Sequence, residues 1–463
     1  MFRIQIVISI LWMFFIPHVF ATTPLITSDM TTPNDVVCKV HEAVAQLSQQ
    51  GKEGLTEFNQ PDGKWVWKNS YMFVLDCDEN KIVAYPFPNL LKNNQQLTKF
   101  MEKRKKFCEI GSSPHGGWLS YLWTDPTSSQ VMRKITYVKS VSNTAYQVAA
   151  GIPDTGISLE ELNKLRCYPG KKILHIDSYD ENYGWSKGIR RGIDSILKDS
   201  GVELKTVYMD TKYNTAEEFG KQAALKVKAE IEKFQPDVVI ASDDNASKYV
   251  VMPYYKDVDL PFIFCGINWD ISTYHYPYQN TTGMVEVELI DSVIKNLRQY
   301  AKGDKLGFLA PDELSEHKIV ENHGRIFQID YSQQFFVKTF AEWKQRFLEL
   351  QTSVDMIIIT NNGGMKDWNE TEARQFVEEH TKIPTGTQND FMMPYVLLGI
   401  VKLSEEQGEW AAQAALQILD GTKPLDIPLS QNKRGKLYVN IRIGNKLDIL
   451  FAPELLELAE IIR

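Results

Sequence analysis

The chain has 463 residues, of which 43% are hydrophobic and 24% are charged, and these values are ordinary for folded domains. This length predicts two or three domains. The formal net charge of −8 and the pI near 5.6 argue against a general surface for nucleic acid, so we expect no nucleic-acid partner.

The first residues predict a secretory signal peptide. Arg3 is followed by an apolar run over 4–16, and Val19-Phe20-Ala21 is a small-residue cleavage pattern. We therefore expect residues 1–21 to be removed, with a loose leader over 22–33; an uncleaved membrane anchor is the alternative. No later run approaches the ~18 apolar residues that cross a bilayer, so we expect no spanning helix in the mature chain.

Residues 34–153 predict an α+β module. A helix is expected over 34–50, capped by Asn34, with apolar residues at helical spacing and Gly51 as its stop. Alternating patterns and turn residues then predict an antiparallel meander. Its expected strands are 71–75, 81–84, 118–123, 134–139 and 146–151.

This module resembles single Cache domains, the PAS-like extracellular sensing modules of bacterial receptors. The resemblance lies in YMFVLDCDENKIVAYP (71–86), GGWLSYLWTDP (116–126) and RKITYVKSVSNTAYQVAAGI (133–152). It departs from the family pattern at Tyr85, where a histidine is common, so the family's ligand class is not carried over. The resemblance implies a pocket on one sheet face, lined by Tyr71, Tyr85, Trp118, Tyr121, Trp123 and Lys134.

Two questions about this pocket remain open. Some of its aromatic side chains would simply fill the core. Because successive side chains of a strand point to opposite faces, only one of Arg133 and Lys134 can face inward, and the resemblance favours Lys134.

After a linker over 154–170, residues 171–463 predict alternating strands and helices. Short apolar runs at 173–176, 204–208, 238–241 and 262–265 are separated by helical stretches, which is typical of a parallel sheet. The alternation repeats after Gly283 and predicts a second α/β lobe. We place a crossover between the lobes near Gly283, because glycine permits the backbone bend that a hinge needs.

This region is similar to a family of bacterial ABC-transporter substrate-binding proteins. The similarity lies in SDDNA (242–246), FCGINW (264–269), TGM (282–284), NNGGMKDW (361–368) and EQGEWAAQAALQILDG (406–421). It implies a type I periplasmic-binding-protein fold, a two-lobed clamshell with parallel sheets. The family's role is the capture of a small solute, often an amino acid or a similar polar metabolite.

The expected solute site lies between the lobes, at the carboxyl ends of strands and the amino ends of helices. A carboxylate such as Asp243 or Glu286 would pair with a ligand amine, and Trp269, Tyr179 or Trp185 would cover an apolar part. Asp and Asn after a strand are also common helix caps, so capping is the alternative for Asp243, Asp244 and Asn245. The candidate residues are Ser178, Tyr179, Asp243, Asp244, Asn245, Asn268, Trp269, Glu286, Asn361 and Asn362.

Catalytic motifs are missing from the sequence, which holds no GxSxG, HExxH, Walker or GxGxxG pattern. His317 and His323 are too far apart for a helical metal pair, and the five cysteines match no zinc spacing. We therefore expect no catalytic residue, no metal and no cofactor. Cys265 ends a buried strand pattern and is expected to be a free thiol, whereas the pairing of the other cysteines stays open.

Two functions from different classes remain. In the first, the protein acts in the periplasm and hands its solute to an ABC permease. In the second, it is a soluble receptor that reports ligand binding to a membrane histidine kinase or chemoreceptor. The Cache-like module favours sensing, and the complete clamshell favours uptake.

Overall fold

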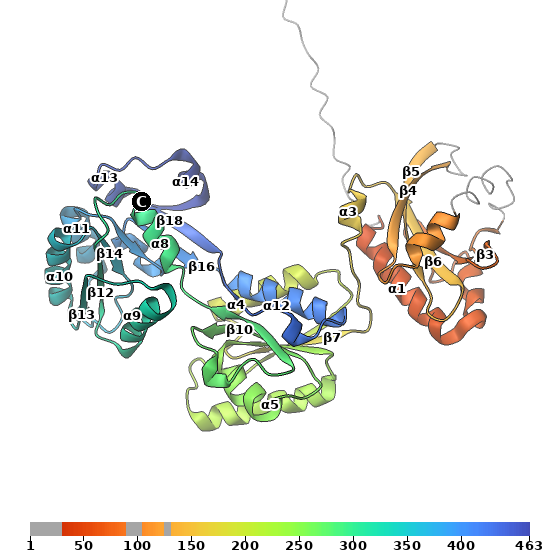
Figure 1. The fold of residues 1–463 in the computed structure, drawn as a ribbon, viewed down its shortest axis with the longest axis horizontal. Helices are drawn as coiled ribbons and strands as arrows, with labels where there is room; N and C mark the ends of the chain where they lie inside the picture. Colours follow the sequence, from red (N-terminus) through yellow and green to blue (C-terminus); the bar gives the residue numbers. More distant parts are fainter. Residues whose placement is uncertain (1–29, 89–103, 125–130) are drawn as a thin grey trace, which may run out of the picture. The chain divides into compact units, whose positions relative to one another are not determined.

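A computed structural model describes residues 30–88, 104–124 and 131–463 (Figure 1). The chain divides into two compact units, Met1–Arg166 and Cys167–Arg463. The expected signal peptide and most of the expected leader lie outside the described residues. Among the residues that are described, no helix is long and apolar enough to cross a membrane.

The first unit is a helix packed on an antiparallel sheet. The sheet has the order β1-β2-β6-β5-β4, and β3 pairs with β2. Helix α1 (Pro33–Gln50) packs on β5 and β6 and buries the predicted apolar side chains. The other elements are η1 (Gly51–Asn59), β1 (Val66–Trp67), β2 (Ser70–Asp76), β3 (Lys81–Ala84), a helical segment over 104–111, β4 (Gly117–Thr124), β5 (Val131–Ser140), β6 (Tyr146–Pro153) and α3 (Leu159–Leu162).

The start of α1 differs from the prediction. Thr32 is the N-cap: its hydroxyl accepts a hydrogen bond from the Asp35 amide, and the Asp35 carboxylate accepts one from the Thr32 amide. Pro33 fills the first helical position, where its missing N–H costs nothing, so Asn34 lies inside the first turn. The predicted stop is confirmed, because Gly51 ends the helix with a φ of 58°.

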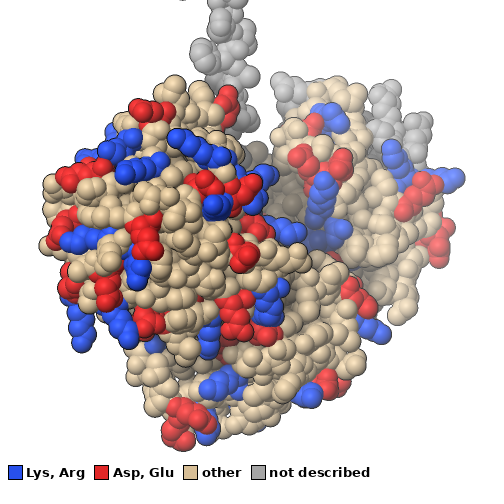
Figure 2. Space-filling model, turned by 60° about the vertical axis from the view of Figure 1, so that its left-hand side comes forward, with Lys and Arg blue, Asp and Glu red and all other residues tan. Residues whose placement is uncertain are grey.

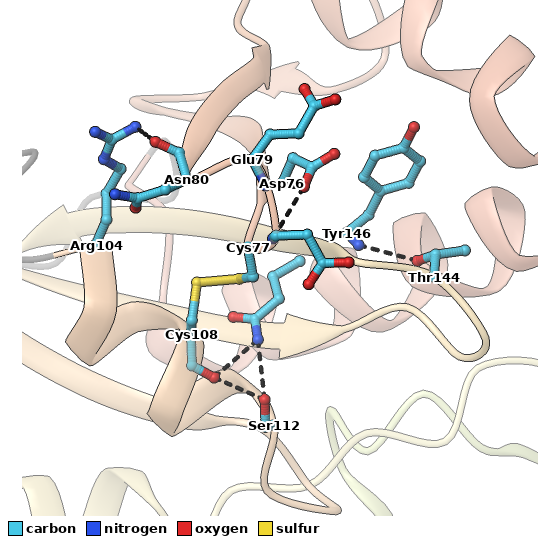
Figure 3. Close-up of a disulfide and its surroundings, with 11 residues drawn as sticks. Asp76, Cys77, Glu79, Asn80, Arg104, Cys108, Ser112, Thr144 and Tyr146 are labelled. Carbon is cyan, nitrogen blue, oxygen red and sulfur yellow. Dashed lines mark hydrogen bonds between the residues drawn. A yellow bond between two sulfur atoms is a disulfide. The ribbon is translucent and has the colours of Figure 1, made fainter.

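A disulfide joins Cys77 to Cys108 in this unit (Figure 3). It ties the turn after β2 to the helical segment over 104–111. Gln147 of β6 adds to the connection, since its amide donates to the Cys108 carbonyl at 2.9 Å and to the Ser112 hydroxyl at 3.2 Å. The free thiol expected at Cys265 is confirmed.

The second unit begins with a parallel sheet of the order β17-β11-β10-β9-β7-β8. Helices α4 (Gly184–Leu197) and α12 (Ser404–Leu419) cover one face, and α5 (Glu217–Phe234) covers the other. The remaining elements of this first lobe are β7 (Lys172–Asp177), β8 (Glu203–Tyr208), β9 (Val238–Ser242), α6 (Asp243–Ala246), η3 (Ser247–Val251), α7 (Met252–Tyr254), β10 (Phe262–Asn268), η4 (Ser272–Tyr274), β11 (Thr281–Glu286), η6 (Pro424–Asp426) and β17 (Ser430–Gln431).

The second lobe has a separate sheet of the order β13-β12-β14-β15-β16-β18-β19 and its own apolar core. All its strand pairs are parallel except β16 with β18. Its elements are α8 (Ile290–Leu297), β12 (Leu306–Pro311), α9 (Leu314–Phe327), β13 (Gln333–Val337), α10 (Phe340–Ser353), β14 (Met356–Ile359), α11 (Glu370–His380), β15 (Thr385–Thr387), η5 (Asp390–Tyr395), β16 (Leu398–Lys402), β18 (Gly435–Asn440), α13 (Ile441–Lys446), α14 (Pro453–Leu458) and β19 (Ala459–Ile462).

Helix α12 returns to the first lobe and lies beside α4, although more than 200 residues separate them (Figure 1). Glycines make this close packing possible. A Cβ at Gly192 would stand 2.8 Å from the Glu409 amide nitrogen, and one at Gly408 would stand 2.9 Å from the Ile193 amide nitrogen. The predicted helix at EQGEWAAQAAL therefore packs as part of the first lobe, before the chain returns to the second lobe at β18.

The chain crosses between the lobes three times, at 287–289, at Leu403 and at 432–434. Gly283 lies inside β11, and the first crossing follows at 287–289, near the predicted position but not at the glycine itself. A Cβ there would overlap the ring of Phe264, which explains the small residue. Asn432 instead joins two crossing segments: it accepts a hydrogen bond from the Val287 amide at 2.7 Å and donates to the Val287 carbonyl at 2.9 Å.

Candidate functional site

Four neighbouring strands of the first lobe, β7, β9, β10 and β11, end at the same sheet edge. Parallel strands bring their carboxyl ends together, and polar residues gather there. Asp177 ends β7, Asp243 follows β9, Asn268 ends β10 and Glu286 ends β11. The predicted residues of the first lobe therefore lie at one edge.

Asp243 is a buried carboxylate of this edge and is only 2% exposed. Its Oδ1 accepts a hydrogen bond from Trp185 Nε1 at 3.1 Å, and its Oδ2 has no hydrogen-bond partner among the described residues. Burial, with the nearby carboxylates of Asp177 and Glu286, raises the pKa of Asp243 well above its usual range. A cationic group at Oδ2 would offset the free-energy cost of ionising this buried carboxyl.

The backbone of Asp243 also has an unusual conformation, for which the neighbouring Gly266 leaves room. Its φ is +66°, a left-handed conformation that aspartate tolerates better than most residues. Gly266, at φ +70°, leaves room for it, because a Cβ at this glycine would stand 2.8 Å from Asp243 Oδ1. The glycine of the FCGINW segment thus keeps space for the buried carboxylate.

Asp177 is a second buried carboxylate that the sequence analysis did not select. Its Oδ1 accepts hydrogen bonds from the Tyr179 amide and the Ser186 hydroxyl, both at 2.8 Å. Burial raises the pKa of Asp177 to about 6. Its place as the last residue of the first buried strand was the signal that could have identified it.

The other polar residues of the SDDNA segment have partners within the lobe. Asp244 accepts hydrogen bonds from the Tyr274 hydroxyl at 2.7 Å and from Asn268 Nδ2 at 3.3 Å. Asn245 donates to the Thr211 hydroxyl at 2.8 Å. Asp244 and Asn268 stay partly or fully exposed, so both can still meet a solute.

Ser178 does not fit the role predicted for it. Its side chain is fully buried, and its hydroxyl donates to the Ser242 carbonyl at 2.6 Å and accepts from the Ala246 amide at 2.7 Å. Both hydrogen-bonding directions of the hydroxyl are thus used inside the lobe. Ser178 fixes the turn that carries Asp243 and is closed to a solute.

Aromatic side chains border the same edge. The rings of Tyr179 and Tyr183 meet edge to face, and Lys212 Nζ lies 4.8 Å and 4.6 Å from their centroids. Burial and the carboxylates of Asp243, Asp244 and Glu286 raise the pKa of Tyr179, so this phenol stays protonated beside the acidic group.

Trp269 reaches the second lobe. Its ring lies 5.8 Å from that of His323 and 6.3 Å from that of Phe327, both on α9. Its amide donates to the Glu286 carbonyl at 2.9 Å. It also borders a groove of about 500 Å³ that Ile271, Val285 and Lys433 help to line. Trp269 is therefore partly exposed at the junction of the lobes.

Glu286 forms an ion pair across that junction. Its carboxylate lies 2.6 Å from Lys402 Nζ, at the end of β16 in the second lobe. Burial raises the pKa of Glu286, with Lys402 opposing the effect. Although burial alone would lower the pKa of Lys402, Glu286, Glu288 and Asp243 raise it overall. The pair links the two lobes.

The second lobe contributes a further polar group that the sequence analysis missed. Glu288 accepts a hydrogen bond from Gln388 Nε2 at 2.9 Å and lies 3.5 Å from His323 Nε2. His323 is fully buried, and its Nδ1 lies 2.7 Å from the Tyr331 hydroxyl. The Oε1 of Gln388 is buried and has no partner in the part of the chain described.

The predicted residues after β14 lie at the corresponding edge of the second sheet. Asn361 donates to Glu316 Oε1 at 3.3 Å and accepts from the Gly363 amide at 2.8 Å. Asn361 and Asn362 are both half-buried. Among the described residues, no group of three His, Cys, Asp or Glu side chains is placed to hold a metal ion.

The predicted pocket residues of the first unit gather on one sheet face, with one exception. The hydroxyls of Tyr71 and Tyr85 lie 3.1 Å apart. Lys134 is 9% exposed, and its Nζ lies 4.8 Å from the Tyr71 ring and 5.4 Å from the Trp123 ring. Tyr121 pairs with Lys134 across β4 and β5, so it shares this face. Arg133 points outward and pairs with Asp154.

Trp118 is the exception, and the prediction that it lines this pocket is wrong. It pairs with Tyr137 across the two strands, and its ring lies 5.5 Å from that of Tyr137. Residues 118 and 121 are an odd number of positions apart, so their side chains point to opposite faces.

The surface carries both signs of charge. On the face shown in Figure 2, Lys and Arg side chains are interspersed with Asp and Glu, without a large area of positive charge. This distribution agrees with the net charge of −8.

Comparisons with known proteins support both units. A Cache domain family model matches residues 64–158, and the model of the ABC transporter substrate binding protein family matches residues 334–462. No curated protein sequence matches the chain.

The second unit is similar to solved structures. A ligand-free, open substrate-binding protein with adhesive properties from Clostridium difficile matches with a TM-score of 0.50 and 15% identity, over 63% of this chain and 99% of that chain. A Streptococcus pneumoniae ABC domain in complex with L-Trp matches with a TM-score of 0.39 and 18% identity, over 63% and 99%. A Bradyrhizobium ABC transporter solute-binding protein with bound bis-Tris matches with a TM-score of 0.40 and 13% identity, over 66% and 90%.

The similarity to the Clostridium difficile protein shows the fold of the second unit. The family models identify the two matched regions. Residues 64–158 thus match the Cache domain family, residues 334–462 match the ABC transporter substrate-binding protein family, and the second unit has the type I periplasmic-binding-protein fold.

Proposed function

We propose that this protein is exported to the periplasm, captures a small polar metabolite between the lobes of its second unit, and presents it to an ABC permease. The solute bears a protonated amine, as amino acids do. The observation that carries the proposal is the buried Asp243, whose Oδ2 has no partner among the described residues. A buried carboxylate without a countercharge is costly, and an ammonium group supplies that charge.

The surrounding side chains support this solute class. Asp243, Asp244, Glu286 and Glu288 are close enough to influence one another's ionisation or that of a shared neighbour. Lys402 is already bound to Glu286 at 2.6 Å. Carboxylates therefore outnumber the cations there, which favours a cationic group over a second anion. Asn268, Asn361 and Asn362 would orient the solute, and Trp269 with Tyr179 would cover its apolar part.

Closure of the lobes would complete the site. The three crossing segments allow one lobe to rotate on the other, as in hinged binding proteins. Trp269 and Glu286 of the first lobe already contact His323 and Lys402 of the second. A solute that contacts both lobes binds the closed form better and shifts the equilibrium towards it.

A thermal-shift screen tests this function. The chain beginning at Thr22 is heated with amino acids, amines, small carboxylates, nucleobases and sugars. A solute that binds only the folded state raises the melting temperature by mass action. We expect the largest rise from an amine-bearing solute, and the rise is expected to be absent from the Asp243→Asn variant. A largest rise from a sugar or a carboxylate without an amine would contradict the proposal.

A sensory role is the second candidate, in which the protein reports ligand binding to a membrane histidine kinase or chemoreceptor. The observation that favours it is Lys134, an ammonium buried among Tyr71, Tyr85, Tyr121 and Trp123 in the Cache domain. A small carboxylate would satisfy this cation. Stabilisation by a carboxylate that Lys134→Met abolishes and Asp243→Asn leaves intact would support sensing through the first unit.

A further inference from the structure

Four basic side chains of the first unit lie near one another and form no ion pair with a described residue. They come from separate elements: His41 from α1, His115 from the turn before β4, Lys139 from the end of β5, and Arg166 from the segment after α3. All four are partly exposed. We call this group the basic cluster. It lies on the α1 side of the sheet, opposite the pocket of Lys134.

Tyr137 is at the centre of the basic cluster. Its hydroxyl lies 3.0 Å from His41 Nε2 and donates a hydrogen bond to the His115 carbonyl. Lys139 is two residues further along β5, and its Nζ donates to the Pro114 carbonyl at 2.6 Å. Gly116 lets this turn pack closely on β5, because a Cβ at this position would stand 3.0 Å from Lys139 Cβ. His41, His115 and Lys139 are therefore brought to one place by the fold.

Arg166 approaches the cluster from the end of α3. One of its terminal nitrogens, Nη1, donates to the carbonyls of Asn163 at 2.7 Å and Leu165 at 2.9 Å. The Asn163 side chain in turn accepts a hydrogen bond from the Trp118 amide at 2.9 Å, which fixes this segment to β4. The other guanidinium nitrogens have no hydrogen-bond partner among the described residues and remain as donors.

The charges of the cluster are not compensated. Other cations of the same unit have carboxylate partners, for example Lys39 with Glu42 and Lys68 with Asp35. None of the four basic side chains forms an ion pair with any of the residues described in 30–88, 104–124 and 131–463. Burial, followed by repulsion from Lys139, His115 and Arg166, lowers the pKa of His41 to about 4. Burial and Arg166 also lower the pKa of Lys139.

We propose that the basic cluster binds a phosphate-type oxyanion, either free inorganic phosphate or the phosphate group of a phospholipid. Charged hydrogen bonds from Arg and Lys to such an oxyanion are strong. A tetrahedral anion also accepts from several directions at once, which suits donors that arrive from four elements. The anion would relieve the mutual repulsion of the cluster.

The experiment uses the full chain and a double variant, Lys139→Gln with Arg166→Gln. Inorganic phosphate is titrated calorimetrically near pH 6, with acetate at equal ionic strength as the comparison anion. The matched control is Lys105→Gln with Lys106→Gln, which removes two exposed positive charges from the same unit. Because the cluster variant loses mutual repulsion, it is expected to melt no lower than the parent in the absence of phosphate, and this checks its folding.

We expect phosphate to bind the parent and the control with affinities within about twofold, and the cluster variant at least tenfold more weakly, roughly the effect of losing charge-assisted hydrogen bonds. Sedimentation with phosphatidylglycerol and phosphatidylcholine vesicles distinguishes the two sources of phosphate. If the parent sediments with phosphatidylglycerol vesicles and the cluster variant does not, the ligand is a lipid phosphate. If only free phosphate binds, the ligand is a soluble anion. Failure of both free phosphate and phosphatidylglycerol vesicles to bind the parent, or equal binding by the parent and the cluster variant, would overturn the proposal.

Discussion

At the scale of single residues, Asp243 dominates the electrostatics of the candidate site. Its carboxyl is 2% exposed and is surrounded by Asp177, Asp244 and Glu286. In the ligand-free protein it holds a proton at pH values at which an exposed aspartate is ionised. An ammonium group would displace that proton, so capture of the solute is expected to release a proton.

This account predicts how Asp243→Asn changes stability. Because the folded pKa of Asp243 lies well above the ordinary value of 3.8, the parent loses stability as the pH rises through the folded pKa. Asparagine does not titrate, and its Oδ1 can still accept from Trp185. We expect the ligand-free variant to melt about 2–4 °C above the parent near pH 8, with little difference near pH 4, as measured by calorimetry.

Asp304→Asn is the control, since it removes the same charge from a side chain that is 85% exposed. It should leave the melting temperature unchanged at both pH values. If Asp243→Asn were less stable than the parent near pH 8, the carboxylate would be stabilising in the ligand-free fold, and the argument for a missing countercharge would fail.

Trp269 tests the placement of the site. Trp269→Ala removes a ring that lies at the junction of the lobes, and Asn268→Ala removes an exposed amide at the same strand end. We expect Trp269→Ala to weaken solute binding at least about tenfold, as for other aromatic anchors, with an unchanged circular dichroism spectrum. Unchanged affinity in both variants would show that the solute binds elsewhere.

At the scale of elements, the ends of β11 and β16 are joined by the buried pair of Glu286 and Lys402. Removing one partner of a buried pair leaves an uncompensated charge, which typically costs about 3–5 kcal/mol. We therefore expect Lys402→Met to lower the free energy of unfolding, measured by urea denaturation, by an amount in that range near pH 8 and by less near pH 5, where Glu286 can take up a proton.

The double variant Glu286→Gln with Lys402→Met removes both charges and completes a double-mutant cycle, which measures the interaction energy of the pair. It should recover most of the lost stability, because no buried charge remains. A double variant as unstable as Lys402→Met alone would mean that the methionine disturbs packing, and that the ion pair contributes little to the junction.

Most elements could be predicted from the sequence because their signals are local. Buried runs such as 238–241 and 262–265 predicted β9 and β10, and the polar residues after them predicted the sheet edge. Trp118 was misplaced by the family resemblance, although strict alternation from Tyr121 would have put it on the other face.

Some residues of the site could not be predicted from the sequence, because their positions depend on how the chain passes between the lobes. Lys402, Gln388 and Glu288 reach the site only because the chain crosses between the lobes and returns. No local pattern distinguishes a lysine at the end of β16 from any solvated lysine. Ser178 shows the converse, since a hydroxyl after a strand can serve a solute or a turn, and only the three-dimensional contacts separate these roles.

At the scale of the whole molecule, ligand binding is expected to close the second unit. Three crossing segments, two of which are joined by Asn432, connect two lobes that have separate cores. Small-angle scattering at saturating solute should show a decrease in the radius of gyration of the parent and none in Asp243→Asn. Binding without any compaction would contradict the clamshell mechanism while leaving solute binding itself in place.

The most direct test of the central claim is calorimetric titration of the strongest stabilising solute into the parent chain and into Asp243→Asn, in two buffers of different ionisation enthalpy. The account predicts a solute with a protonated amine, release of a proton on binding to the parent near pH 6, and an affinity at least ~30-fold weaker in the variant, as expected when a buried charge pair is truncated. Equal affinity in parent and variant, or tight binding of a solute that carries no amine, would contradict it.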